Sequence, residues 1–132
     1  MLATDGSARG NRSSFGYCIS RSDSKILFKS HSPVIADYDY HFSDRAELSA
    51  ILAATSHIKM IFDTLPLQNN LKSHSFPLYT DSASSITRIE DKAFNSTKTV
   101  LKSNLDVLCE IQVVCKQMKP KINVSCGFTS RR

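Results

Sequence analysis

Three acidic residues stand where the sequence predicts that a strand ends or a helix begins. Asp5 lies in "ATDGSARGN", after a short apolar stretch and before small residues and glycines, as is typical of a strand entering a turn. Asp81 follows "FPLYT" in the same way, and Glu47 lies near the start of a helical pattern. Carboxylates gathered without counter-ions raise one another's pKa, so a cluster of them favours a bound cation such as Mg²⁺. If the fold brings Asp5, Glu47 and Asp81 together, they form a metal site.

The N-terminal quarter of the chain predicts a three-stranded antiparallel meander. Phe15, Tyr17 and Ile19 alternate with small or polar residues, and "SKILFKSHSPVI" repeats the period of two. The polar "RSDS", residues 21–24, predicts a hairpin turn between these two strands. Asp5 is expected on a neighbouring strand.

A long amphipathic helix is predicted over "SDRAELSAILAATSHIKMIF", with Ser43 or Asp44 as its cap. One face of this helix carries Glu47, Ile51, Ala54, Ile58 and Ile61. A carboxylate therefore begins the stripe that faces the core, where an ionised group loses hydration. A second interpretation makes Glu47 part of a capping box that reaches back to Asp44, and the spacing fits both.

The second half of the chain predicts a strand, helices and a last strand. "FPLYTDSASS" passes from strand to helix, "SASSITRIEDK" is a short helix, and a loop follows around Asn95. A longer helix ends before Pro120, and "KINVSCGF" is the last strand. The apolar positions of the longer helix are Leu101, Leu105, Leu108, Ile111 or Gln112, Cys115 and Met118. Right-handed crossovers between parallel strands would bring the three acids to one point.

Composition limits the classes of protein that this sequence can encode. The chain has 132 residues, which suits one domain, and 17 Lys and Arg against 12 Asp and Glu give a formal charge of +5. This charge favours polyanionic partners. No stretch approaches the roughly 20 apolar residues of a membrane span, and "MLATDG" is unlike a signal peptide. We therefore expect no membrane association and an intracellular location, with cytoplasm and nucleus not distinguished.

The cysteines show neither a CxxC pair nor a zinc-site spacing with histidine. We expect four reduced and mostly buried thiols, which are Cys18, Cys109, Cys115 and Cys126.

Three motifs carry a resemblance to a known family. "TDGSA", "RAELSAILAA" and "LYTDSASSI", in this order and spacing, resemble the ribonuclease H family over nearly the whole chain. The resemblance implies an α/β fold with a mixed five-stranded sheet, three antiparallel strands and then parallel strands, flanked by helices. It also implies an endonuclease that hydrolyses the RNA strand of RNA–DNA hybrids with two Mg²⁺ or Mn²⁺ ions. Its catalytic and metal-binding residues would be Asp5, Glu47 and Asp81.

Three further residues follow the acids in these motifs. The resemblance implies that Ser7, Asn11 and Ser82 contact the backbone of the hybrid. Turn and cap chemistry is the other interpretation of the same three residues.

The variant that the chain most resembles is the domain attached to retrotransposon reverse transcriptases, in which "SSFGYCI" and "FSDRAE" are similar in style. This implies an upstream reverse transcriptase domain, in a longer polyprotein, as a partner. The family pattern continues past the fifth strand into a loop with a histidine, a fourth acid and a final helix, whereas no Asp or Glu follows Glu110 here. We therefore expect a single domain over residues 1–132 that lacks this C-terminal loop and helix.

Two other functions remain open from the sequence. A catalytically weak or inactive remnant of such a domain would still bind nucleic acid, with stacking by "DYDYHF" (37–42) and phosphate contacts from basic residues. These basic residues are Lys98, Lys102, Lys116, Lys119, Lys121, Arg131 and Arg132. Alternatively, "TDGS" would be the phosphate loop of an actin-like ATPase, although four glycines are few for such a protein.

Overall fold

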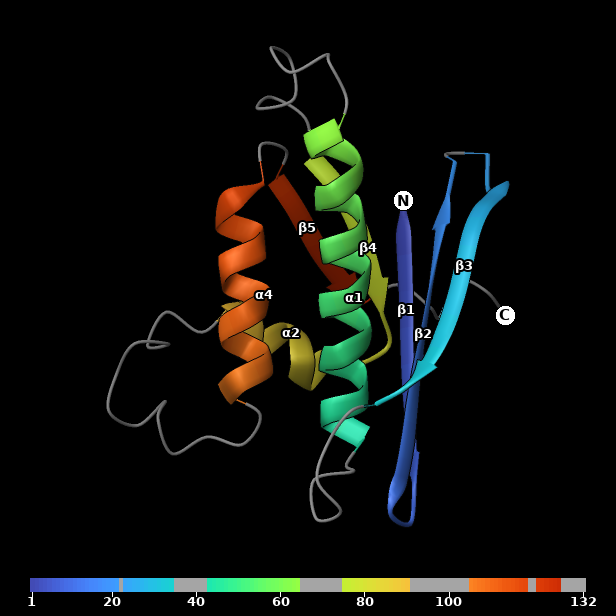
Figure 1. Cartoon of the computed structure of the whole chain (residues 1–132), viewed down its shortest axis with the longest axis vertical. Coiled ribbons are helices and arrows are strands. Elements are labelled where there is room, and N and C mark those ends of the chain that lie inside the picture. The colour runs from blue at the N-terminus through green and yellow to red at the C-terminus, as the bar shows by residue number, and fades with distance from the viewer. Residues whose placement is uncertain (22, 35–42, 65–74, 91–104, 119–120, 127–132) are drawn as a thin grey trace.

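The computed structural model describes residues 1–21, 23–34, 43–64, 75–90, 105–118 and 121–126 (Figure 1). Within these residues, five strands form one sheet in the order β3-β2-β1-β4-β5. The strands are β1 (Leu2–Arg9), β2 (Arg12–Ser20), β3 (Ile26–Pro33), β4 (Ser75–Thr80) and β5 (Lys121–Cys126). The helices are α1 (Ser43–Thr64), α2 (Ala83–Glu90) and α4 (Leu105–Gln117). The first three strands are antiparallel and β4 and β5 run parallel to β1, which confirms the predicted fold class.

Two tight hairpins connect the antiparallel strands. Gly10 and Asn11 join β1 to β2, and Gly10 has a φ of 61°, a left-handed conformation that glycine adopts without strain. The predicted "RSDS" turn joins β2 to β3, where the Arg21 amide donates a 2.9 Å hydrogen bond to the Lys25 carbonyl. The meander predicted from the sequence is therefore confirmed.

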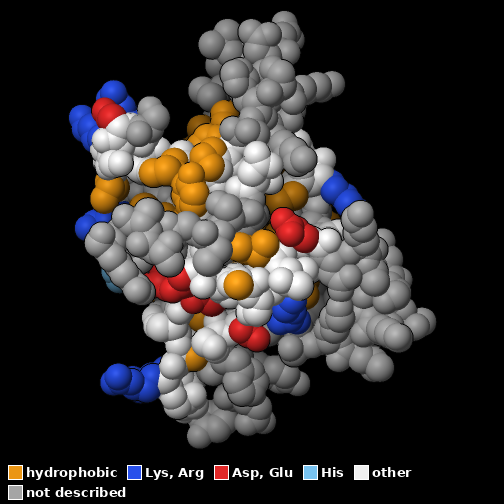
Figure 2. Space-filling model, turned by 180° about the vertical axis from the view of Figure 1, so that it is seen from behind, with side chains coloured by type: hydrophobic (Ala, Val, Ile, Leu, Met, Phe, Trp, Pro, Cys, Tyr) orange, Lys and Arg blue, Asp and Glu red, His pale blue; other side chains and the backbone are white. Residues whose placement is uncertain are grey.

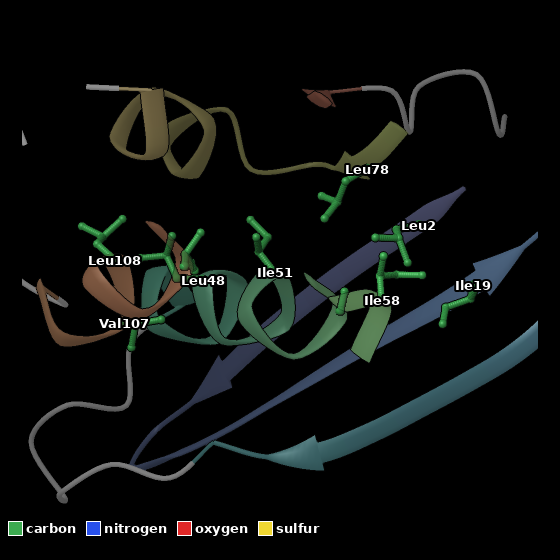
Figure 3. Close-up of a cluster of buried hydrophobic side chains, with 10 residues drawn as sticks. Leu2, Ile19, Leu48, Ile51, Ile58, Leu78, Val107 and Leu108 are labelled. Carbon is green, nitrogen blue, oxygen red and sulfur yellow. The ribbon is translucent and has the colours of Figure 1, made fainter. Parts of the chain in front are cut away.

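The three described helices lie together on one side of the sheet, with α1 across β1 and β2 and α4 beside it (Figure 1). The core between helices and sheet is apolar, and Figure 3 shows most of it. Its buried members include Leu2, Ile19 and Leu78 from the sheet, Leu48, Ile51 and Ile58 from α1, and Val107, Leu108 and Ile111 from α4. The apolar stripe predicted for α1 is buried as far as Ile58, while Ile61 is half-buried.

Side chains of β1 alternate between the two sides of the sheet. Leu2 and Thr4 are buried on the side of the helices. Asp5, Ser7 and Arg9 are exposed and lie on the other side. We call this other side, which no described helix covers, the open face of the sheet.

Some expectations from the sequence are corrected by the structure or fall outside its description. The three thiols whose burial is described are not mostly buried, because Cys109 is exposed and Cys18 and Cys115 are half-buried, while the side chain of Cys126 lies outside the description. Cys18 lies on the open face, and Cys109 on α4 lines a hollow together with Arg45 and Ser49 of α1. Among the described residues, no helix is long and apolar enough to cross a membrane. Outside the described residues lie the "DYDYHF" segment, the loop around Asn95, Leu101, Pro120, Lys98, Lys102, Lys119, Arg131 and Arg132.

Candidate active site

The three predicted acids meet in the structure. Each of Asp5, Glu47 and Asp81 offers a carboxylate oxygen, and these oxygens all lie within 4.8 Å of one another. Asp5 and Asp81 are exposed, whereas Glu47 is only 8% exposed. The cluster therefore consists of one acid buried against the protein and two acids open to solvent.

The register of β1 against β4 places the two aspartates side by side. Thr4 is the partner of Thr80 in the last parallel pair between these strands, so Asp5 and Asp81 follow at equivalent positions. The Thr4 hydroxyl donates a 3.3 Å hydrogen bond to the Tyr79 carbonyl, which further ties the two strands at this point. Both aspartates thus emerge where the parallel pairing stops.

Asp5 does not end its strand, contrary to the sequence interpretation. β1 continues to Arg9 because its residues keep their antiparallel pairing with β2, from Asp5 opposite Gly16 to Arg9 opposite Arg12. The "TDGS" segment is therefore extended strand, so it forms no phosphate loop of the kind that the ATPase interpretation needs. Asp81 is different, since β4 ends at Thr80 as predicted.

Gly6 lets the start of α1 approach β1 closely. A Cβ atom at this position would lie 2.5 Å from the Glu47 amide nitrogen and 2.6 Å from the Ala46 carbonyl oxygen, which are both backbone atoms. Real side chains do not approach so closely, so any residue other than glycine would push the helix away. This contact brings the Glu47 side chain over β1 to the aspartates.

The Glu47 carboxyl group lies beside Asp5, Asp81 and the backbone of Gly6. Burial, followed by the charges of Asp81 and Asp5, raises its pKa to about 7, although the Gly6 amide opposes this shift by favouring the charged form. Its neighbours are thus the other acids, which favours the metal-site interpretation over a capping box with Asp44.

The donor set fits a divalent cation. Glu47 Oε2 is buried and has no hydrogen-bond partner within the described part of the chain, which is costly for a carboxylate oxygen. None of the ion pairs among the described residues involves the three acids. Mg²⁺ and Mn²⁺ take oxygen ligands and keep positions for water or phosphate, so such an ion would satisfy Oε2 and offset the repulsion.

Comparison with solved structures identifies the architecture that holds these acids. LC11-RNase H1, isolated from compost and crystallised with an RNA/DNA hybrid, superposes with a TM-score of 0.70 at 18% identity. The match covers 96% of this chain and 83% of that one. The chain has the ribonuclease H fold.

Further structures with the ribonuclease H fold agree. The N-terminal RNase H domain of a Mycobacterium tuberculosis protein gives a TM-score of 0.66 at 16% identity, covering 96% of this chain and 81% of that one. The foamy viral protease-reverse transcriptase, solved in complex with an RNA/DNA hybrid, gives 0.72 at 16% identity. This second match covers 98% of the chain but only 18% of the viral protein. The amino-acid sequence matches no protein-family model and no curated protein.

Ser82, one of the three residues expected to contact the hybrid, caps a helix of the ribonuclease H fold. Its Oγ accepts a 3.3 Å hydrogen bond from the Ser85 amide and lies 2.8 Å from the Ser85 hydroxyl, which is buried. The Ser82 amide donates a 3.2 Å bond to the Thr80 hydroxyl. These bonds fix the turn that presents Asp81.

Ser7 and Asn11, the other two expected contacts, are not part of the acid cluster. Ser7 is exposed, two residues beyond Asp5 on the open face, with its hydroxyl 3.4 Å from that of Ser14. Asn11 is exposed in the turn after Arg9. Since a strand rises about 3.3 Å per residue, Asn11 lies roughly 13 Å or more along the hairpin from Asp5.

One supporting pair was not found from the sequence. Arg45, two residues before Glu47, donates two hydrogen bonds of 3.0 and 2.8 Å to the carboxylate of Asp106. This joins the first turn of α1 to the first turn of α4 across 61 residues of sequence. No local pattern marks such a pair, whereas the "DGS" motif does mark the tight approach at Gly6.

Proposed function

We propose that this chain is a divalent-metal-dependent endonuclease that hydrolyses the RNA strand of RNA–DNA hybrids. The observation that carries the proposal is the meeting of Asp5, Glu47 and Asp81 around a buried oxygen without a partner. This cluster stands on a fold shared with proteins solved in complex with RNA/DNA hybrids.

The residues of the cluster have distinct parts in this proposal. Glu47 is held from behind by α1 and by the contact at Gly6, so it anchors the cation on the protein side. Asp5 and Asp81 face solvent and leave the opposite side of the cation free for a phosphate oxygen. Mg²⁺ or Mn²⁺, with two ions expected, would supply an activated water and neutralise charge on the scissile phosphate.

The charge of the chain supports a nucleic-acid substrate. With a formal charge of +5, the chain as a whole attracts a polyanion, while the acids mark the position at which only a cation-bound phosphate would be tolerated. The proposal of a hybrid rather than another nucleic acid rests on the likeness to LC11-RNase H1 and to the foamy viral enzyme.

The proposed partner is a reverse transcriptase domain of the same polyprotein, as in a retroelement. The foamy viral match supports this context, because the part that resembles this chain is 18% of a protease-reverse transcriptase. Co-purification of this chain with an adjoining polymerase domain encoded upstream would test the partnership.

Cleavage of an end-labelled RNA–DNA hybrid in Mg²⁺ or Mn²⁺ tests the activity. We expect metal-dependent cutting of the RNA strand alone, abolished by Asp81→Asn and unchanged by Asp63→Asn, an exposed acid of α1 paired with Lys59. Double-stranded DNA and double-stranded RNA should stay intact. Hybrid binding without cutting, by a folded wild-type sample, would instead support the binding-only alternative.

A further inference from the structure

Arg9 and Arg12 face each other directly at the end of the β1–β2 hairpin. They are the last pair in the register of the two strands, and both are exposed. Like charges directly opposite in a sheet are destabilising. Neither arginine takes part in an ion pair within the described residues. The hairpin therefore ends in two adjacent positive charges with no protein counter-ion in the described part of the chain.

These arginines lie on the same side of the sheet as the acid cluster. Asp5, Ser7 and Arg9 are alternate residues of β1, and all three are exposed on the open face. Four residues at about 3.3 Å each place Arg9 roughly 13 Å from Asp5 along the strand. Figure 2 shows the molecule from behind the helices, with a group of acidic side chains and with Lys and Arg side chains at the left margin.

The surroundings of the two arginines are rich in hydrogen-bond donors. Ser7, Asn11 and Ser14 join Arg9 and Arg12 in lining an open hollow of about 520 Å³ at the hairpin. Among the residues that the structure describes, none of those lining this hollow is acidic. Guanidinium, hydroxyl and amide groups are the side chains that contact phosphate oxygens in nucleic-acid complexes, and arginine does so in a bidentate manner.

We propose that Arg9 and Arg12 form a phosphate-binding subsite that holds the sugar-phosphate backbone of the hybrid at a distance from the scissile phosphate. This inference rests on the proposed function and adds a second point of attachment to it. At an axial rise of about 3.4 Å per base pair, 13 Å corresponds to about four base pairs. The acids and the arginines would contact the duplex at two separate points, and together they would determine where along the hybrid the cleaved bond lies on the open face.

Salt dependence of hybrid binding tests the subsite. The variant Arg9→Gln/Arg12→Gln is compared with Arg21→Gln/Lys25→Gln, which removes the same charge at the β2–β3 turn, at the other end of the sheet. Each neutralised phosphate contributes about 0.9 to the slope of log K against log salt. We expect the first variant to lose on the order of tenfold in affinity and to lower the slope by about 1–2. The control should stay close to wild type.

Shortened hybrids test the position of the subsite. Two series are made in which the duplex ends fewer than about four base pairs from the cleaved bond, on one side or on the other. In the series whose duplex ends before it reaches the arginines, wild type and Arg9→Gln/Arg12→Gln should bind the hybrid with the same affinity. Equal affinity and slope for the two double variants would overturn the subsite and leave the nuclease proposal standing. A folded wild type that neither binds nor cuts the hybrid would overturn both.

Discussion

Gly6 on β1 and Glu47 on α1 approach so closely that a methyl group on Gly6 would lie 2.5 Å from the Glu47 amide nitrogen. The helix therefore rests on bare strand backbone at the point where the buried acid enters the site. This contact couples the packing of α1 to the geometry of the acid cluster.

Gly6→Ala should weaken metal binding as well as destabilise the fold. The added methyl group forces α1 away from β1, at a cost of about 1–3 kcal/mol typical of overpacking, and carries Glu47 away from the aspartates. Titration calorimetry with Mn²⁺ should show at least tenfold weaker binding. Gly10→Asn is the control, because that turn position is open and asparagine tolerates its left-handed φ. Wild-type affinity in Gly6→Ala would contradict this account.

Asp81→Asn should weaken binding of Mg²⁺ and Mn²⁺ without unfolding the chain. The amide keeps the shape of the side chain but removes one of three negative charges, so we expect at least a tenfold loss in affinity by calorimetry. Thermal unfolding of the metal-free variant should occur at or above the wild-type temperature, since repulsion with Glu47 is relieved. Asp63→Asn serves as the matched control on α1. Equal binding by Asp81→Asn would rule out the shared site.

The pH dependence of stability should report on Glu47 in the metal-free protein. Its pKa is about 7 when folded against an ordinary 4.5, so folding favours the protonated form. Its favourable contribution is complete below pH 4.5 and is lost as pH rises through 7. The non-titrating Glu47→Gln should therefore gain about 1–3 kcal/mol relative to wild type between pH 4.5 and pH 8.

Chemical denaturation of both proteins at a series of pH values, in the presence of a chelator, checks this prediction. Saturating Mg²⁺ should remove the effect in wild type, because the ion holds Glu47 ionised. A pH-independent difference between the two proteins would contradict the prediction.

Arg45 and Asp106 should stabilise the contact between α1 and α4 by about 1 kcal/mol, measured as coupling in a double-mutant cycle with Arg45→Met and Asp106→Asn. Arg45 holds the pKa of Asp106 below its usual value, so this contribution is present near neutral pH and lost as pH falls below that depressed pKa. The exposed pair Lys59 and Asp63 should give a smaller coupling of about 0.3–0.5 kcal/mol. If the coupling between Arg45 and Asp106 is no larger than that between Lys59 and Asp63, the pair adds little to the stability of the contact between α1 and α4.

The elements of the fold were predictable where the sequence has a clear period. Alternation in "SSFGYCI" predicts β2, and the apolar stripe from Ile51 to Ile58 predicts α1. Both patterns arise because their apolar side chains face the same core. The acid cluster was predictable because Asp5, Glu47 and Asp81 each stand in a short motif on one of these elements. The buried Val107 is missing from the apolar pattern expected for α4, although it lies four residues before Ile111 and therefore on the same face of the helix.

Features that depend on how strands pair and how helices pack could not be predicted. Asp5 was expected at a strand end, but the partner strand β2 extends β1 by four further residues. The bond between Arg45 and Asp106 joins two helices across 61 residues. Arg9 lies opposite Arg12 because the turn between β1 and β2 has two residues. The pairing of these strands could be worked out only once the bounds of both were known.

The three acids come from β1, α1 and the end of β4, so a cation bound by all three would join segments that are 76 residues apart in the chain, from Asp5 to Asp81. The unfolded chain cannot assemble such a site, and binding would therefore shift the folding equilibrium by mass action. At a concentration of 100 times the dissociation constant, the ion adds about 2.7 kcal/mol to the free energy of unfolding. The folded fraction of this domain would then follow the concentration of free divalent cation around it.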